Sequence, residues 1–304
     1  MKRTRHSRAF TRDGALIARV RAIDHALDRA LPAASAPPRR LHAAMRYAAL
    51  SPGKRVRPLL VLASCEALGG AWRRALPAAA ALELVHAFSL VHDDLPALDD
   101  DDFRRGRPTA HRRYGEAVAL LAGDALLALA FETLAGLGRE GVGAVRIAEA
   151  QRVLAHASGS RELVGGQVLD LEAEGRRVRA VDVRAIHARK TGALIGAALA
   201  LGALVAGANA RRVRAMEQLG RGLGLAFQIQ DDLMNRSATL RQLGKRAGTD
   251  AALGKATYPA ALGEPRSRRA AAAAFQRARG TIARLGRRAD PLGRLVQTIE
   301  ARTR

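Results

Sequence analysis

Aromatic residues, cysteine and lysine are all scarce in this 304-residue chain, and each scarcity limits what the protein can be. Aromatics make up 3% of the residues although 48% are hydrophobic, so the core must consist largely of Ala and Leu, which favour helices. The single cysteine, Cys65, excludes an intramolecular disulfide and is typical of a reducing compartment. We find neither a signal-peptide apolar segment nor an unbroken run of about 18 apolar residues. We therefore expect a cytoplasmic protein without an integral membrane segment.

Acidic residues are also few, and the formal net charge is +23. The basic residues are spread along the whole chain without interleaved aromatics, so the charge alone does not predict a nucleic-acid partner. Nearly all of them are arginines. The five lysines are Lys2, Lys54, Lys190, Lys245 and Lys255. An internal lysine in such a chain indicates a place where a compact ammonium is needed and a guanidinium does not fit.

Hydrophobic residues recur at helical spacing along most of the chain, and no segment alternates at period two for long enough to predict a strand. The predicted helices cover 14–30, 39–50, a segment ending at 68, 75–94, 115–136, 142–157, 160–171, 181–206 and 211–234, with further helices near the end. The pair Gly165-Gly166 predicts a close helix approach or a kink. We expect a flexible basic arm over 1–12 and one all-α domain of ten or more helices over 13–304.

An acidic cluster follows the apolar helix at 75–94. Six of the 16 Asp residues fall within 93–102, and Arg104 and Arg105 follow at once. Carboxylates this close repel one another unless cations lie among them, and Mg²⁺ prefers carboxylate and phosphate oxygens. Arginine binds phosphate through its planar fork. A solvated acidic loop is the alternative, but the apolar helix that leads into the cluster favours a metal–diphosphate site.

A second acidic position lies on the helix at 211–234. Leu223, Phe227 and Asp231 follow one another at i, i+4 spacing, so Asp231 projects from the same side as core residues. A carboxylate placed there must be paired or metal-bound, because burying it alone is too costly. The alternative is a polar helix end that faces solvent.

These motifs occur in the order His92-Asp93-Asp94-Leu95-Pro96-Ala97-Leu98-Asp99, Arg104-Arg105-Gly106 and, far downstream, Gln230-Asp231-Asp232. Others are Gly53-Lys54-Arg55-Val56-Arg57-Pro58, Gly165-Gly166-Gln167-Val168-Leu169-Asp170-Leu171, Lys190-Thr191-Gly192 and Phe227-Gln228, with Lys245 and Lys255 in Leu-Gly-Lys settings. This set resembles the trans-isoprenyl diphosphate synthases (the polyprenyl synthetase family), and the bacterial farnesyl diphosphate synthases most closely, over roughly residues 15 to 300.

The resemblance implies an isoprenoid-synthase-type helical bundle around a central cavity. It implies Mg²⁺-dependent head-to-tail condensation of isopentenyl diphosphate with dimethylallyl or geranyl diphosphate to give farnesyl diphosphate, with three Mg²⁺ ions when substrate is bound. It assigns metal binding to Asp93, Asp99 and Asp231, and catalysis to Asp93, Asp94, Asp99, Arg104, Lys190, Thr191, Gln228 and Asp231. It assigns substrate binding to Lys54, Arg57, His86, Arg104, Arg105, Lys190, Thr191, Gln228, Lys245 and Lys255. A homodimer is expected, and no nucleic-acid partner.

In this family an aromatic five residues before the first Asp motif goes with a C15 product, so Phe88, with Ser89, is expected to set chain length. A buried core position is the alternative for Phe88. The second Asp motif departs from the family pattern, because it reads Asp-Asp-Leu-Met-Asn and ends in Asn235. This leaves open a diverged paralogue that makes geranylgeranyl or geranyl diphosphate, or a non-catalytic partner subunit. A terpene cyclase and a nucleic-acid binder are weaker alternatives. We expect weakened but retained metal binding at the second motif.

Overall fold

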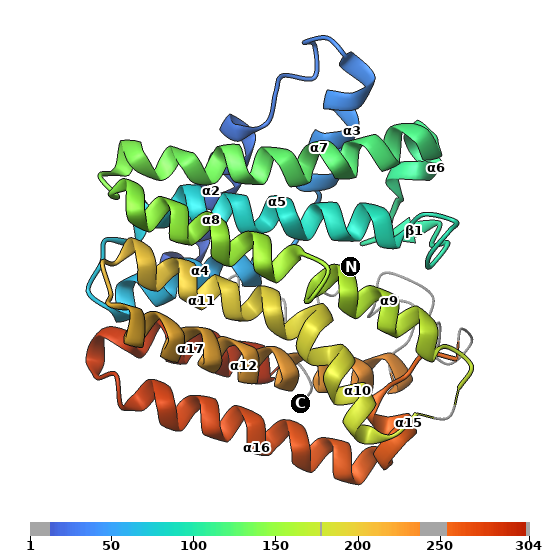
Figure 1. Cartoon of the computed structure of the whole chain (residues 1–304), viewed down its shortest axis with the longest axis vertical. Coiled ribbons are helices and arrows are strands. Elements are labelled where there is room, and N and C mark those ends of the chain that lie inside the picture. Colours follow the sequence, from blue (N-terminus) through green and yellow to red (C-terminus); the bar gives the residue numbers. More distant parts are fainter. Residues whose placement is uncertain (1–12, 177, 238–253, 302–304) are drawn as a thin grey trace.

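The structure is a computed structural model that describes residues 13–176, 178–237 and 254–301. Within these ranges it is a helical bundle with one two-stranded hairpin, which confirms the predicted all-α class (Figure 1). The expected arm at 1–12 lies outside the described residues. The helices are α2 (Gly14–Ala30), α3 (Arg39–Ala49), α4 (Val56–Ala67), α5 (Leu76–Asp93), α6 (Ala110–Tyr114), α7 (Glu116–Ala135), α8 (Ala144–Ser158), α9 (Leu163–Ala173), α10 (Ala180–His187), α11 (Ala193–Val205), α12 (Ala210–Ser237), α15 (Tyr258–Leu262), α16 (Glu264–Ala283) and α17 (Asp290–Glu300).

Helix α11 lies at the centre of the bundle, with α8 on one side of it and α12 on the other in Figure 1, and it also packs against α4. Every residue of α11 is buried, and most are Ala, Leu or Gly, so small side chains let the helices approach closely. Gly202 shows how closely, because a Cβ there would lie 2.3 Å from the carbonyl oxygen of Val61 in α4. At the same crossing the Ser64 hydroxyl donates to the Leu199 carbonyl over 2.6 Å. Because the core has few aromatic side chains to fill space, its helices pack closely through small residues.

Helix α5 carries the first acidic cluster to the edge of the core. It has a proline in its first turn, ends at Asp93 and is capped by Asp94, and Pro96 follows, as the sequence predicted. Beyond it, β1 (Phe103–Arg104) and β2 (Arg107–Pro108) pair antiparallel. This hairpin was not predicted, since two residues per strand are too few to show a period of two.

The long helical pattern at 181–206 is not one regular helix. It consists of α10, a π-helical turn at Ala188–Gly192 (η3) and α11. A π-turn inserts one residue into the helix and shifts the side chains that follow it around the axis, and such turns are frequent at functional sites. Lys190 and Thr191 lie within this turn. Gly166 of α9 touches it, because a Cβ there would lie 2.5 Å from the Lys190 backbone nitrogen, which confirms the predicted close approach.

Three helical segments are long and apolar enough, by length and composition, to cross a membrane: Trp72–Asp93, Glu116–Glu140 and Ala180–Val205. This differs from the sequence-based expectation, which required an unbroken apolar run. In the first and third segments most of the apolar window is buried inside the protein, at 67% and 83%. In Glu116–Glu140, which contains α7, only 33% is buried. Helix α7 therefore presents an apolar surface to its surroundings, including Leu120 and Leu121, which are 46% and 56% exposed.

Candidate active site

Two acidic motifs that are far apart in sequence line one cavity of about 200 Å³. Asp93 and Asp99, from the end of α5 and the loop after it, form one wall. Gln228, Asp231 and Asn235, on successive turns of α12, form another. Lys190 and Thr191, from the π-turn, and Lys255, which precedes α15, complete the lining together with Arg104. The cavity therefore combines carboxylates with fixed cations, as expected for a site that binds a metal and a diphosphate.

A larger, basic cavity of about 570 Å³ adjoins the first. Lys54 and Arg57, from the loop and first turn that begin α4, and His86 of α5 line it. Arg105 of the hairpin turn does so too, and Arg104 and Asp231 line both cavities. The acidic motifs therefore have two sets of basic groups beside them. One set, in the smaller cavity, includes Lys190 and Lys255, and the other, in the larger cavity, includes Lys54, Arg57 and Arg105.

The loop that enters α4 is held by a buried arginine. Arg55 takes a left-handed backbone conformation at φ +48°, and its guanidinium donates to Glu83 and Asp24, both over 2.8 Å. A left-handed non-glycine residue is strained and persists only where its surroundings fix it. These ion pairs supply that constraint. They fix the loop so that Lys54 and Arg57, on either side of Arg55, face the cavity.

His86 is held next to Arg57, with 3.1 Å between the His86 Nε2 and an Arg57 Nη. Burial lowers the pKa of His86 well below its usual range, and the nearby Arg57, Arg105 and Arg104 add to the effect. The imidazole is therefore neutral, and its Nε2 accepts a hydrogen bond from Arg57. This leaves the Nδ1–H as a donor for an anionic ligand.

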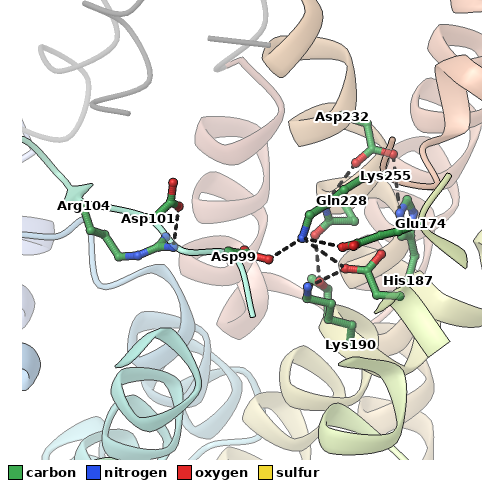
Figure 2. A network of polar contacts seen from close by, with 11 residues as sticks. Asp99, Asp101, Arg104, Glu174, His187, Lys190, Gln228, Asp232 and Lys255 are labelled. Atoms are coloured by element: carbon green, nitrogen blue, oxygen red, sulfur yellow. Dashed lines mark hydrogen bonds and ion pairs between the residues drawn. The ribbon is translucent and has the colours of Figure 1, made fainter. Parts of the chain in front are cut away.

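Lys255 lies among acidic residues from two parts of the chain, the loop after α5 and the C-terminal end of α9 (Figure 2). Its Nζ is 2.5 Å from Asp99, 3.7 Å from Asp170 and 3.7 Å from Glu174. Burial opposes the charge on the ammonium, but Asp99 and Asp170 outweigh it and raise the pKa of Lys255. Asp170 also accepts from Lys190 over 2.7 Å. Asp170 therefore contacts both Lys190 and Lys255. The ammonium of Lys255 is paired with protein carboxylates, whereas the resemblance assigned it to substrate binding.

The two adjacent aspartates of the first motif have different surroundings. Asp93 lines the smaller cavity, and burial raises its pKa, with nearby Asp99 adding to the effect and Lys190 opposing it. Asp94 instead accepts from the Arg104 guanidinium over 2.6 Å. Burial raises the pKa of Asp94 to about 6, although Arg104 works in the opposite direction. At neutral pH Asp94 is therefore ionised and holds Arg104 in place.

A chain of hydrogen bonds connects the π-turn to α12 and α15. The Thr191 hydroxyl donates to the Gln228 carbonyl oxygen over 2.8 Å, and the Gln228 amide donates to Asp232 over 3.1 Å. Asp232 also accepts from the Tyr258 backbone N–H over 3.0 Å. His187 stacks on the Tyr258 ring, 5.4 Å between centroids, and its Nε2 lies 3.5 Å from Asp232. Asp232 is therefore used to orient Gln228.

The donor set fits Mg²⁺ held jointly by protein and substrate. Asp93, Asp99 and Asp231 line the same cavity and offer carboxylate oxygens, and the buried side-chain oxygen of Asn235 has no hydrogen-bond partner. Across the ranges that the structure describes, no group of three or more His, Cys, Asp or Glu side chains is arranged to hold a metal ion. Mg²⁺ usually completes its shell with water and substrate phosphates, so this arrangement agrees with a substrate-bridged ion.

Most of the predicted site residues thus line the two cavities. Lys245 lies outside the described residues. Phe88 and Ser89 lie below Asp93 on α5, where Phe88 is a core residue and the Ser89 hydroxyl donates to the His86 carbonyl over 2.9 Å. The sequence reasoning assigned no role to four residues that the structure places at the site: Asp170, Glu174, His187 and Asp232. Two of them could have been predicted from the sequence. His187 lies three residues before Lys190, and Asp170 belongs to the Gly165-Gly166-Gln167-Val168-Leu169-Asp170-Leu171 motif.

Comparison with known proteins gives consistent matches. A family model described as Polyprenyl synthetase matches residues 38–282. A dimethylallyltranstransferase from Fischerella ambigua is 46% identical over 88% of this chain and 77% of its own. The large subunit 2 of a heterodimeric geranylgeranyl pyrophosphate synthase from Arabidopsis thaliana is 42% identical over 85% of this chain and 68% of its own. The apo crystal structure of an FPP/GFPP synthase from Zymomonas mobilis matches with a TM-score of 0.80 and 38% identity, over 91% of this chain and 94% of that one.

Proposed function

Because this chain belongs to the polyprenyl synthetase family and is a prenyl diphosphate synthase that condenses isopentenyl diphosphate with allylic diphosphates, we propose that its main product is C15 farnesyl diphosphate. The observation that carries the product length is Phe88. It lies five residues before Asp93 on α5, about 7.5 Å along the helix axis. In the family pattern described above, an aromatic at this position goes with a C15 product, and a ring of this size would dominate any pocket that it borders.

The basic cavity binds isopentenyl diphosphate in this proposal. Lys54, Arg57 and Arg105 supply positive charge, and His86 donates from its Nδ1. The burial and the arginine contacts described above keep His86 neutral, so it acts as a hydrogen-bond donor and not as a base. The left-handed turn at Arg55 keeps these groups in place before substrate arrives, which lowers the ordering cost of binding.

The acidic cavity binds the allylic diphosphate. Arg104, held by Asp94, and Lys190, held by Asp170, contact its oxygens, while Asp93, Asp99 and Asp231 bind Mg²⁺. When bound, Mg²⁺ supplies positive charge that stabilises the leaving diphosphate. Arg104 and Lys190 are preorganised for the same charge, and such fixed groups lower the barrier most where water is excluded.

The reaction needs no protein nucleophile. The allylic C–O bond breaks, its electron pair leaves with the diphosphate, and the double bond of isopentenyl diphosphate forms the new C–C bond to the allylic carbon. The departed diphosphate then takes the proton that is lost. The Thr191 hydroxyl and the Gln228 amide, oriented through Asp232, direct their dipoles to the developing positive charge.

A geranylgeranyl product is the second candidate, favoured by the name of the Arabidopsis relative. Product analysis with labelled isopentenyl diphosphate separates the two. Wild-type protein and Phe88→Tyr, which keeps a ring, are expected to stop at C15, whereas Phe88→Ala is expected to extend to C20 or beyond. A wild-type product of C20 that does not change in Phe88→Ala would overturn the assignment of Phe88.

We also propose a homodimer that forms through the apolar surface of α7. What supports this is the exposure of Leu120 and Leu121 on a helix whose apolar window is only 33% buried. A heteromeric partner is the alternative, since the Arabidopsis relative is named as a subunit of a heterodimer. A cytoplasmic location, which fits one cysteine in a 304-residue chain, is part of the same proposal.

A further inference from the structure

Phe88 does not stand alone on α5, because His92 lies one helical turn after it. The two rings meet edge to face, with 4.9 Å between centroids and 75° between planes. Aromatic pairs in this geometry attract each other beyond the area they bury. Phe88 is only 6% exposed, so the ring has little freedom on its other sides. The position of the Phe88 ring therefore depends on the position of the His92 ring.

His92 is in turn fixed to the neighbouring helix α7. Its Nε2 donates to the backbone carbonyl oxygen of Leu120 over 3.0 Å. It also lies 3.8 Å from the Asp124 carboxylate. These contacts anchor the imidazole against α7.

Gly123 of α7 makes room for the imidazole. A Cβ at this position would lie 2.1 Å from the His92 Nε2 and 2.3 Å from its Cδ2, both far inside van der Waals contact. Gly123 is buried in the middle of α7, where a glycine is normally unfavourable compared with alanine. Because Gly123 has no side chain, the surface of α7 has a notch at this position, and the His92 ring fills it.

We propose that the notch at Gly123 and the His92 ring seated in it form a backing that holds Phe88 in place, and that this backing is a specificity-determining feature of the product length. The inference rests on the proposed role of Phe88 as the limit of the product pocket. Neither Gly123 nor His92 lines either cavity, so in this proposal they act as positioning residues. The alternative is that they only join α5 to α7 and leave product length unaffected.

The first test compares product lengths for His92→Ala, His92→Phe and Phe88→Ala with labelled isopentenyl diphosphate and geranyl diphosphate. His92→Ala removes the ring behind Phe88, which can then swing aside. We expect the C20 to C15 ratio to rise by roughly tenfold, the lower end of what one methylene of space changes in an apolar pocket. His92→Phe keeps a ring in the notch and is expected to stay near the wild-type ratio. The ratio is read on folded protein and is independent of how far the rate falls.

The combination of variants separates this proposal from the proposed function. If His92 acts through Phe88, the double variant His92→Ala/Phe88→Ala gives the same product lengths as Phe88→Ala alone, because coupled residues are not additive. If Phe88→Ala lengthens the product but His92→Ala leaves the ratio unchanged, the backing role is wrong and the role of Phe88 stands. If Phe88→Ala itself leaves the product length unchanged, Phe88 does not limit the product, and the role of His92 behind it is wrong as well.

Gly123→Ala supplies an independent check. Its methyl group must displace the His92 ring, so it is expected to change the C20 to C15 ratio in the wild-type background. In the His92→Ala background no ring occupies the notch, and the same substitution is expected to leave the ratio unchanged. An equal effect in both backgrounds would mean that Gly123 acts through helix packing alone, and the proposal would be wrong.

Discussion

Asn235 ends the second acidic motif, one of the positions at which the sequence departs from the pattern of the family that it resembles. Its side-chain oxygen is buried at the acidic cavity, without a hydrogen-bond partner, one helical turn after Asp231. A neutral amide oxygen can still bind a cation, but it contributes no charge, and metal affinity rises with the number of charged ligands. We therefore propose that the site keeps the ligand position and binds Mg²⁺ more weakly than a site with a third carboxylate would.

We predict that Asn235→Asp tightens Mg²⁺ binding in the presence of inorganic diphosphate on the order of tenfold, as expected for one added charged ligand. Isothermal titration calorimetry measures this directly. Asn209→Asp is the matched control, because it adds the same charge near the start of α12, where Asn209 caps the Arg212 N–H over 3.0 Å. Equal affinities in Asn235→Asp and wild type would show that Asn235 is not near the ion.

We predict that His187 makes the stability of the protein depend on pH. Burial lowers its pKa to about 4 from an ordinary value of 6.5. The unfolded chain therefore binds the extra proton between pH 6.5 and 4 while the folded protein does not. The free energy of unfolding is highest above pH 6.5 and falls as the pH is lowered towards 4, by about 3 kcal/mol in all from this group.

The His187→Phe variant, which keeps a ring against Tyr258, is expected to lose this dependence on pH. Urea unfolding at several pH values between 4 and 7 compares the slopes of the two proteins. If both proteins lose stability in parallel, His187 is not the group responsible.

At the scale of elements, the sequence predicted helices well and their interruptions poorly. The apolar run, Pro96 and the acidic cluster correctly predicted where α5 ends, because each signal is local. The π-turn at Ala188–Gly192 was missed because one inserted residue barely disturbs an apolar pattern in which every α11 position is buried. Yet this turn places Lys190 and Thr191 in the cavity. Local strain of this kind is set by tertiary packing and has little sequence signature.

The crossing of α4 and α11 depends on Gly202. We predict that Gly202→Ala lowers the free energy of unfolding by about 2 kcal/mol, since its methyl group would meet the Val61 carbonyl and the helices would have to separate. Gly280→Ala is the matched control in α16, where a Cβ meets nothing within 4 Å and the residue is exposed. That change is expected to add about 0.5–1 kcal/mol. Similar destabilisation in both variants would contradict the role of close helix packing.

At the scale of the whole molecule, the sequence predicted which residues line the site better than it predicted the contacts between them. Lys255 and Asp99 are 156 positions apart, and neither periodicity nor composition pairs them. The partners of the lysines, Asp170 and Glu174, were missed for the same reason. A motif set in the right order could predict the family and the cavity. The contacts between motifs follow from how the helices pack, which a single sequence does not specify.

The apolar surface of α7 belongs to this scale because we propose that it forms the interface of a dimer. We predict that Leu121→Glu shifts the protein from dimer to monomer in sedimentation velocity experiments, since a charge would have to be buried at the interface. Val181→Glu is the control: Val181 on α10 is 60% exposed, and α10 is distant from α7 in Figure 1. Dissociation in both variants, or a monomeric wild type, would mean that α7 does not form the interface.

The most direct measurement of the central claim is a Mg²⁺-dependent condensation assay with labelled isopentenyl diphosphate and each allylic partner in turn: dimethylallyl, geranyl and farnesyl diphosphate. We predict condensation with the first two, a dominant C15 product, and loss of at least a hundredfold of the rate in Asp93→Asn, as expected when one preorganised charge is removed. Circular dichroism confirms that each protein is folded. No condensation by folded wild-type protein with any allylic partner would contradict the account and favour a non-catalytic partner subunit.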